Sequence, residues 1–283
     1  MKKNNKLISG IFPLASHHIG VASNSKELMD FFFKNYHCQK FEFSKDNKIS
    51  LSFKIHKNES GVYILYCSAI EFRMQIDNIN TEEKNWCVIE AIKIISQYYF
   101  TLKGTLFLHG SATNYENKGY IFSGIAGSGK STISDNMGLK EKFADDQVIV
   151  EKKKGKYLVY STVFDQKLKT PNFNGIQLGG IFFIGQSLGL EIKPLLKIDK
   201  ILQLLMTNDL HNSVFEFYLN QSQGDKRLHS TIAKKLFTLP FRNEQLKLYL
   251  SLIHEIGFYH LLLPRNIAKK TLFNLILKLG VVF

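Results

Sequence analysis

Hydrophobic and polar residues follow two different periods along the first hundred residues. Residues 25–36 carry apolar side chains three and four positions apart after an acidic first turn, which predicts an amphipathic helix. Residues 48–55 and 71–76 alternate polar and apolar side chains, and residues 62–66 form an apolar run, so three strands are expected. A second helix is expected over residues 81–100. These elements predict a small α+β unit.

The pattern changes after the second helix. Residues 105–112 are strand-like, residues 114–119 are rich in turn formers and residues 120–123 are apolar again, which together predict a hairpin. Further strands are predicted at 147–151, 157–161 and 180–184, and helices at 131–139, 197–207, 230–237 and 267–279. The chain is therefore expected to divide into domains of residues 1–104 and 105–283.

A glycine-rich segment follows the predicted strand 120–123. Residues 124–131 (GIAGSGKS) match the Walker A phosphate-loop pattern G-x-x-x-x-G-K-[ST] at every fixed position. Glycines let backbone N–H groups approach a phosphate, Lys130 neutralises its charge, and the Ser131 hydroxyl can bind Mg²⁺. The residues expected to hold a nucleoside triphosphate are Gly124, Ala126, Gly127, Ser128, Gly129, Lys130, Ser131 and Thr132.

Two adjacent carboxylates, Asp145 and Asp146, stand at the entry to the predicted strand 147–151. The short segment after Lys130 must bring them back beside the phosphate loop. Such a pair can divide two tasks, because one carboxylate can hold Mg²⁺ while the other accepts a proton from an attacking hydroxyl. Alone, two aspartates at a strand edge are more often a solvated turn. The neighbouring phosphate loop favours a role in the site.

His109 lies on the first strand of the predicted hairpin. A single histidine among apolar residues is more often a core residue than a catalyst. Here the hairpin would place it next to the strand that leads into the phosphate loop, so His109 is a candidate site residue.

Charge is the outlier in the composition. Lys and Arg number 37 against 24 Asp and Glu, a formal net charge of +13. The excess is almost all lysine, which is typical of composition bias. A nucleic-acid surface favours arginine, which pairs with phosphate and guanine, and no zinc-finger, RRM or basic-zipper pattern is present. We expect no nucleic-acid partner, and the positive charge favours ATP and an acidic acceptor.

The sequence also predicts the compartment. The basic N-terminal residues are followed by short apolar stretches without a cleavage site, and charged residues and histidines interrupt the apolar tract 246–263. Cys38, Cys67 and Cys87 form no CxxC pair and are expected to be reduced thiols. A cytoplasmic protein without a membrane span is expected.

Three motifs in this order resemble a known family. Residues 108–112 (LHGSA), 124–132 (GIAGSGKST) and 144–146 (ADD) look like the C-terminal kinase domain of HPr kinase/phosphorylase and its relatives, including the HPr kinase-like enzymes that phosphorylate lasso-peptide precursors. The resemblance is clear over residues 105–150 and looser as far as Pro264. It implies an α/β fold with a mixed sheet, of the phosphoenolpyruvate carboxykinase type, beside the smaller N-terminal α+β domain.

The resemblance also implies roles for the matching residues. The phosphate loop would hold ATP, Ser131 and Asp146 would hold Mg²⁺, Asp145 would be the base toward a serine hydroxyl, and His109 would tune the acid pair. The residues themselves leave open which aspartate is the base, because adjacent carboxylates share a titration. The chemistry implied is in-line phosphoryl transfer.

Two features of the HPr kinase/phosphorylases are missing from the sequence. Their later glycine-arginine-asparagine signature is absent, and residues 174–179 lack the acidic residue that those enzymes have there. HPr as the substrate and the reverse phosphorylase reaction are therefore not implied. Residues 1–104 do not resemble the N-terminal domain of that family, and both a substrate-recognition module and a structural annex stay open.

The leading expectation is an ATP- and Mg²⁺-dependent serine kinase that acts on a peptide or small protein, such as a ribosomally made lasso-type precursor. Two alternatives stay open, namely a kinase for a small anionic metabolite and a nucleotide-gated binding module without transfer. The sequence decides neither the acceptor nor whether the protein forms a homo-oligomer.

Overall fold

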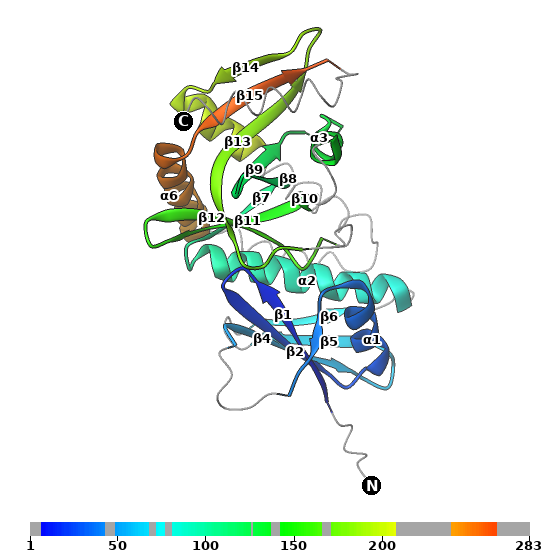
Figure 1. The fold of residues 1–283 in the computed structure, drawn as a ribbon. Helices are drawn as coiled ribbons and strands as arrows, with labels where there is room; N and C mark the ends of the chain where they lie inside the picture. The colour runs from blue at the N-terminus through cyan, green and yellow to red at the C-terminus, as the bar shows by residue number, and fades with distance from the viewer. Residues whose placement is uncertain are drawn as a thin grey trace. The chain divides into compact units, whose positions relative to one another are not determined.

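The computed structural model describes residues 7–42, 49–67, 72–76, 81–125, 127–136, 142–165, 171–207 and 239–264. It is mixed α/β, as predicted, with two mixed sheets (Figure 1). The chain divides into two compact units, one of residues 1–103 with 214–244 and the other of residues 104–213 with 245–283.

The first unit combines a six-stranded sheet with two helices. Its elements are β1 (Ile8–Leu14), β2 (His17–Ser23), α1 (Lys26–Asn35), β3 (Gln39–Lys40), β4 (Leu51–Lys57), β5 (Tyr63–Cys67), β6 (Phe72–Ile76) and α2 (Thr81–Thr101). The strand order is β3-β1-β2-β4-β5-β6, with β2 and β4 parallel. The predicted helices and strands correspond to α1, α2, β4, β5 and β6. The pattern did not indicate β1, because Gly10 and Pro13 interrupt its apolar positions.

A buried polar chain joins three elements of the first unit. The Ser25 hydroxyl caps α1 and lies 3.2 Å from the Tyr63 hydroxyl on β5. Tyr63 Oη in turn donates to Asn85 Oδ1 on α2 at 3.2 Å. Ser25 and Asn85 are buried and Tyr63 is fully enclosed, so these hydrogen bonds replace the water that the polar groups lose on folding.

The second unit is built on the larger sheet. Its elements are β7 (Thr105–His109), β8 (Ser111–Tyr115), β9 (Lys118–Ser123), α3 (Lys130–Asn136), β10 (Lys142–Ala144), β11 (Gln147–Lys153), β12 (Lys156–Ser161), β13 (Ile176–Gln186), β14 (Glu191–Pro194), α6 (Leu239–Glu255, from Gln245 on) and β15 (Phe258–Leu263). Residues 197–207 form a further helix, as predicted. The helices predicted over 230–237 and 267–279 lie outside the described residues.

The predicted hairpin is present, but it begins later than expected. Residues 105–112 are not one strand, because the chain breaks at Gly110 into β7 and β8. A Cβ at Gly110 would lie 2.7 Å from the carbonyl oxygen of Phe122, an approach that only glycine allows. The hairpin is formed by β8 and β9 through Glu116 and Asn117, both with positive φ, whereas β7 pairs with β11.

The two end strands of the larger sheet, β7 and β10, each continue directly into a strand that lies further inside the same sheet. The strand order is β10-β8-β9-β13-β12-β11-β7, and β15 pairs with both β13 and β14. At one end β7 runs into β8 through Gly110, and at the other β10 runs into β11 through Asp145 and Asp146. The Gly110 N–H donates to the Asp146 carbonyl at 3.0 Å, so the two bends lie against each other.

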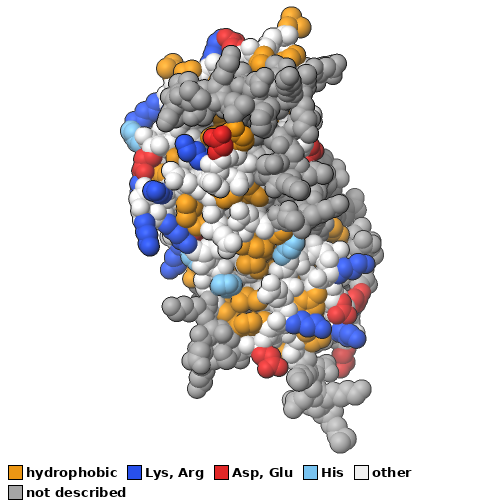
Figure 2. Space-filling view, viewed as in Figure 1, with side chains coloured by type: hydrophobic (Ala, Val, Ile, Leu, Met, Phe, Trp, Pro, Cys, Tyr) orange, Lys and Arg blue, Asp and Glu red, His pale blue; other side chains and the backbone are white. Residues whose placement is uncertain are grey.

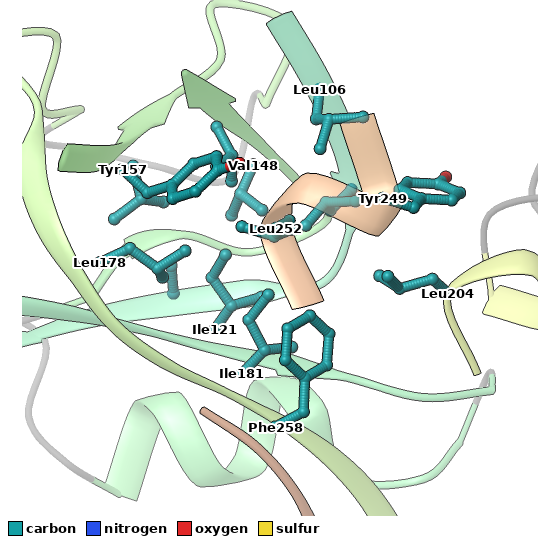
Figure 3. Close-up of a cluster of buried hydrophobic side chains, with 14 of the residues drawn as sticks. Leu106, Ile121, Val148, Tyr157, Leu178, Ile181, Leu204, Tyr249, Leu252 and Phe258 are labelled. Carbon is teal, nitrogen blue, oxygen red and sulfur yellow. The ribbon is translucent and has the colours of Figure 1, made fainter. Parts of the chain in front are cut away.

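The strand that leads into the phosphate loop is covered on both faces. Ile121 of β9 belongs to a buried cluster that includes Leu252 of α6 and residues of the neighbouring strands (Figure 3). Phe122 faces the other way, in a second cluster with Ile133 of α3, and its ring stacks on Phe182 of β13 at 5.5 Å between centroids. Each such side chain contributes about 1.5–3 kcal/mol on burial. β9 is therefore a rigid support for the loop.

Candidate functional site

The predicted phosphate loop connects β9 to α3. β9 ends at Ser123 and α3 begins at Lys130. Between them Gly124, Gly127 and Gly129 have φ values of 154°, 77° and 101°, conformations that residues with a Cβ rarely adopt. The glycines at these three positions of the sequence motif are thus required by the backbone path.

Gly124 is packed closely at the start of the loop. A Cβ there would lie 2.7 Å from Ser128 Oγ and 3.0 Å from the Ile184 carbonyl oxygen. Ser128 N donates to the Ile125 carbonyl at 3.2 Å and closes a turn. Within the described residues the buried Ser128 Oγ has no hydrogen-bond partner, and a ligand oxygen could supply one. Ala126, predicted to belong to the loop, lies outside the described residues.

Lys130 folds back along the loop. Its side chain is buried, and Nζ donates to the carbonyl oxygens of Gly124 at 2.9 Å and Ile125 at 3.0 Å. Burial lowers the pKa of Lys130, while the charges of Asp146 and Asp145 act in the opposite direction. An ammonium group has three donors, so one remains for a phosphate oxygen when both carbonyl bonds persist.

Ser131 and Thr132 lie in the first turn of α3, where Ser131 is partly buried and Thr132 is exposed. Among the described residues no three His, Cys, Asp or Glu side chains converge as a metal site. Mg²⁺ that arrives with a nucleotide needs fewer protein ligands, because phosphate and water oxygens complete its shell. The Ser131 hydroxyl and a partly exposed carboxylate such as that of Asp146 are hard oxygen donors, and this donor set fits such an ion.

The acid pair occupies the bend between β10 and β11, and its two carboxylates have different surroundings. The Asp145 side chain is 5% exposed, and its Oδ1 lies 2.5 Å from Lys142 Nζ. The Asp146 side chain is 47% exposed, and its Oδ1 lies 3.6 Å from His109 Nδ1. One carboxylate is thus enclosed and ion-paired, while the other is open to solvent beside an imidazole.

Lys142 links the acid pair to α3. Its Nζ also lies 2.7 Å from Asp135 Oδ1. Burial alone would lower the pKa of Lys142, but the hydrogen bonds to Asp135 and Asp145 outweigh it and raise the pKa above its ordinary value. Lys142 therefore stays charged at neutral pH and keeps a positive charge against Asp145.

Serine hydroxyl bonds and strand pairing hold His109 near the predicted phosphate loop and the acid pair. The His109 carbonyl accepts from Ser123 Oγ at 2.7 Å, directly before the first loop residue. Ser111 Oγ donates to the Lys130 carbonyl at 3.0 Å, which ties β8 to the start of α3. His109 pairs across the sheet with Gln147, the first residue of β11 after the acid pair. The structure thus gathers the residues that the sequence singled out at one end of β7, β9 and β11.

Sequence reasoning missed Asp165, which lies in the loop after β12. Its carboxylate is buried, and Oδ2 accepts the backbone N–H of Asp145 at 2.6 Å and that of Asp146 at 3.2 Å. No spacing signal could have identified Asp165, because it lies in an irregular segment well downstream of the acid pair. Lys142 was also missed, although its position three residues before Asp145 was visible in the sequence.

The described basic side chains do not form one patch on the face shown in Figure 2. Figure 2 shows Lys and Arg side chains in separate groups on the visible face, several of them beside acidic side chains. Lys152 forms an ion pair with Glu255, and Lys193 Nζ lies 2.7 Å from Glu191 Oε1. Within the described part of the chain, no helix has the length and apolar character needed to cross a membrane.

Comparisons with known proteins do not identify a function for this chain. No family model matches the chain, and no curated protein matches it. Among solved structures, the Hpr(Ser) kinase/phosphatase from Coxiella burnetii aligns with 62% of this chain and 99% of that chain, at 9% identity and a TM-score of 0.30. A likeness of this size supports no conclusion about this chain.

Proposed function

We propose that the second unit binds ATP with Mg²⁺ and transfers the γ-phosphoryl group to a serine or threonine hydroxyl of a peptide or small protein. The observation that carries the proposal is the placement of Asp146 beside His109, with both aspartates of the acid pair near enough to Lys130 for their charges to oppose the lowering of its pKa by burial. The sequence resemblance to HPr kinase-like enzymes rests on the same residues. Phosphoryl transfer needs positioned phosphates and neutralised charge more than covalent help from the protein.

In this proposal each residue of the site has one task. The loop from Gly124 to Thr132 binds the phosphates, and Lys130 neutralises their charge. Ser131 and Asp146 hold Mg²⁺, which when bound offsets negative charge on the phosphates. Asp145 takes the proton of the acceptor hydroxyl. His109, whose Nδ1 lies 3.6 Å from Asp146 Oδ1, tunes the acid pair.

An exchange of roles between the two aspartates has one observation in its favour. Asp146 is 47% exposed, so an acceptor on a large molecule can reach it, whereas Asp145 is 5% exposed. In that arrangement Asp146 beside His109 takes the proton and Asp145 holds the metal.

A nucleotide-gated module without transfer is the second candidate function. It is favoured by the ion pair between Lys142 and Asp145, because a carboxylate held by an ammonium group is a weaker proton acceptor. In this case ATP would bind at the loop, and the acid pair would sense the bound phosphates and metal without accepting a proton.

The deciding experiment supplies the protein with γ-labelled ATP, Mg²⁺ and the peptides encoded by neighbouring genes. Mass spectrometry then searches for a phosphate adduct on a Ser or Thr side chain. A labelled acceptor that needs both ATP and Mg²⁺ supports the kinase. Tight ATP binding without any adduct or ADP release would favour the gated module.

A further inference from the structure

The acid pair interrupts the hydrogen-bond ladder of the sheet. Ala144 pairs with Ala112 on β8, and Gln147 pairs with His109 on β7, so the two residues between them lie outside both ladders. Buried backbone N–H groups need an acceptor, because an unpaired one costs as much as a lost hydrogen bond. The N–H groups of the acid pair therefore require a partner outside the sheet.

One carboxylate oxygen of Asp165 is the partner of both N–H groups. Asp165 Oδ2 accepts both N–H groups, from Asp145 at 2.6 Å and from Asp146 at 3.2 Å. A carboxylate makes shorter and stronger hydrogen bonds to N–H groups than a neutral acceptor does. Because both bonds end on the same atom, they restrict the rotation of the peptide unit between the two aspartates.

The loop that carries Asp165 is itself attached to the strand before the acid pair. Asp165 N donates to the Thr162 carbonyl at 3.4 Å, and Phe164 N donates to Thr162 Oγ1 at 3.3 Å, so a turn holds residues 162–165. Ser161 Oγ donates to the Phe143 carbonyl at 2.5 Å. With 4% of its surface exposed, Asp165 is enclosed rather than solvated.

The consequence is a fixed divergence of the two carboxylates. Asp145 is turned to Lys142 and Asp146 to His109, and this divergence depends on the backbone between them. We propose that Asp165 is a positioning residue for phosphoryl transfer, which holds the acid pair in its working orientation through these two N–H bonds. This inference rests on the proposed function, and Asp165 touches neither substrate nor metal in it.

Two variants separate the hydrogen bonds from simple packing. Asp165→Asn keeps an amide oxygen that can accept both N–H groups, whereas Asp165→Ala removes the acceptor. We expect Asp165→Ala to lower kcat about 100-fold, the scale for a misplaced catalytic group, and to change KM for ATP less than about threefold. Asp165→Asn should recover most of that loss and stay within about tenfold of the wild type.

A matched control is Glu151→Gln, which alters another buried carboxylate on β11. Glu151 Oε1 accepts from Thr105 Oγ1 at 3.0 Å, and Glu151 pairs with Thr105 of β7 across the sheet. Glu151→Gln should lower the melting temperature without the selective loss of kcat. An equal loss of kcat in Glu151→Gln, or in Asp165→Asn and Asp165→Ala alike, would overturn the positioning role.

Amide NMR tests the same inference without any turnover. In Asp165→Ala the backbone amide protons of Asp145 and Asp146 should shift upfield and exchange faster with solvent, while those of β12 stay in place. Unchanged amide signals would refute the role of Asp165. If the wild-type protein transfers no phosphate but these amides respond as expected, the proposed kinase function fails and the role of Asp165 in orienting the acid pair survives.

Discussion

A buried polar chain in the first unit and the surroundings of the predicted phosphate loop in the second differ in how their polar groups are paired. In the first unit Ser25, Tyr63 and Asn85 bond to one another, and their bonds connect a helix cap, a strand and a helix. In the second unit the buried Ser128 Oγ and Gln147 Oε1 have no partner within the described residues, and both lie at the phosphate loop or next to the acid pair. Buried polar groups that bond to one another stabilise a fold. Ser96 Oγ on α2 also lacks a partner within the described residues, so it is the position of Ser128 Oγ and Gln147 Oε1 beside the Walker A motif and the acid pair that favours a ligand there.

The largest effect is expected from Lys130→Ala. The change removes the one ammonium group within the loop, and the loss of a charge-assisted contact to phosphate should weaken ATP binding by about 10- to 100-fold and stop transfer. Titration with a fluorescent ATP analogue measures the affinity. Lys156→Ala, an exposed lysine on β12, is the control and should bind ATP like the wild type. Retained binding and transfer in Lys130→Ala would contradict the phosphate-loop interpretation.

Asp145→Asn should separate binding from chemistry. The amide cannot accept a proton, so transfer should fall by about 10²–10⁴ while ATP affinity stays within about threefold. Rates of phosphopeptide formation and the same ATP titration measure the two quantities, with Glu191→Gln on β14 as the exposed control. If Asp146→Asn loses transfer at saturating Mg²⁺ and Asp145→Asn instead needs more Mg²⁺, the two roles are exchanged.

Gly124→Ala should damage the loop through its backbone. The added Cβ meets Ser128 Oγ and the Ile184 carbonyl in a conformation that favours glycine, which should cost about 3 kcal/mol of unfolding free energy and weaken ATP binding. Gly104→Ala is the matched control, because φ is also positive there but no atom lies within 4 Å of the new Cβ. It should cost about 1 kcal/mol. Urea denaturation measures both unfolding free energies. An equal loss of unfolding free energy in Gly124→Ala and Gly104→Ala would show that crowding at Gly124 is unimportant.

Tyr63→Phe should have the smallest effect and act on the first unit alone. Removing the hydroxyl leaves Ser25 and Asn85 without their shared partner, at a cost of about 1 kcal/mol in unfolding free energy. Differential scanning calorimetry measures this cost, and ATP titration should show no change. A marked loss of ATP affinity would mean that the polar chain of the first unit is coupled to the nucleotide.

The sequence predicted most elements whose signal is local. Periodicity located α1, α2 and the strands β4, β5, β11, β12 and β13, because apolar spacing reports directly which face of an element is buried. It joined residues 105–112 into one strand and missed β1, where Gly10 and Pro13 obscure the pattern. It also did not indicate β2, β3, β10, β14, α6 and β15. The break at Gly110 arises from the close approach of the Phe122 carbonyl, a contact made by a distant strand.

The candidate site shows the same contrast between local signals in the sequence and contacts made by distant segments. The Walker A motif was visible from spacing alone, and Gly124, Gly127 and Gly129 within it have positive φ values. The different surroundings of Asp145 and Asp146 were not visible, because Lys142, His109 and Asp165 approach them from three separate segments.

By itself, the sequence predicted that the chain is mixed α/β and located a Walker A motif, an acid pair and a histidine along it. These properties depend on residue type and short-range spacing, which are the same whether or not the chain is folded. Only the tertiary structure decided that the sheet curls at Gly110 and the acid pair, and that one aspartate is enclosed while the other is exposed. Those outcomes depend on hydrogen bonds between residues far apart in the chain, such as the one from Gly110 N–H to the Asp146 carbonyl.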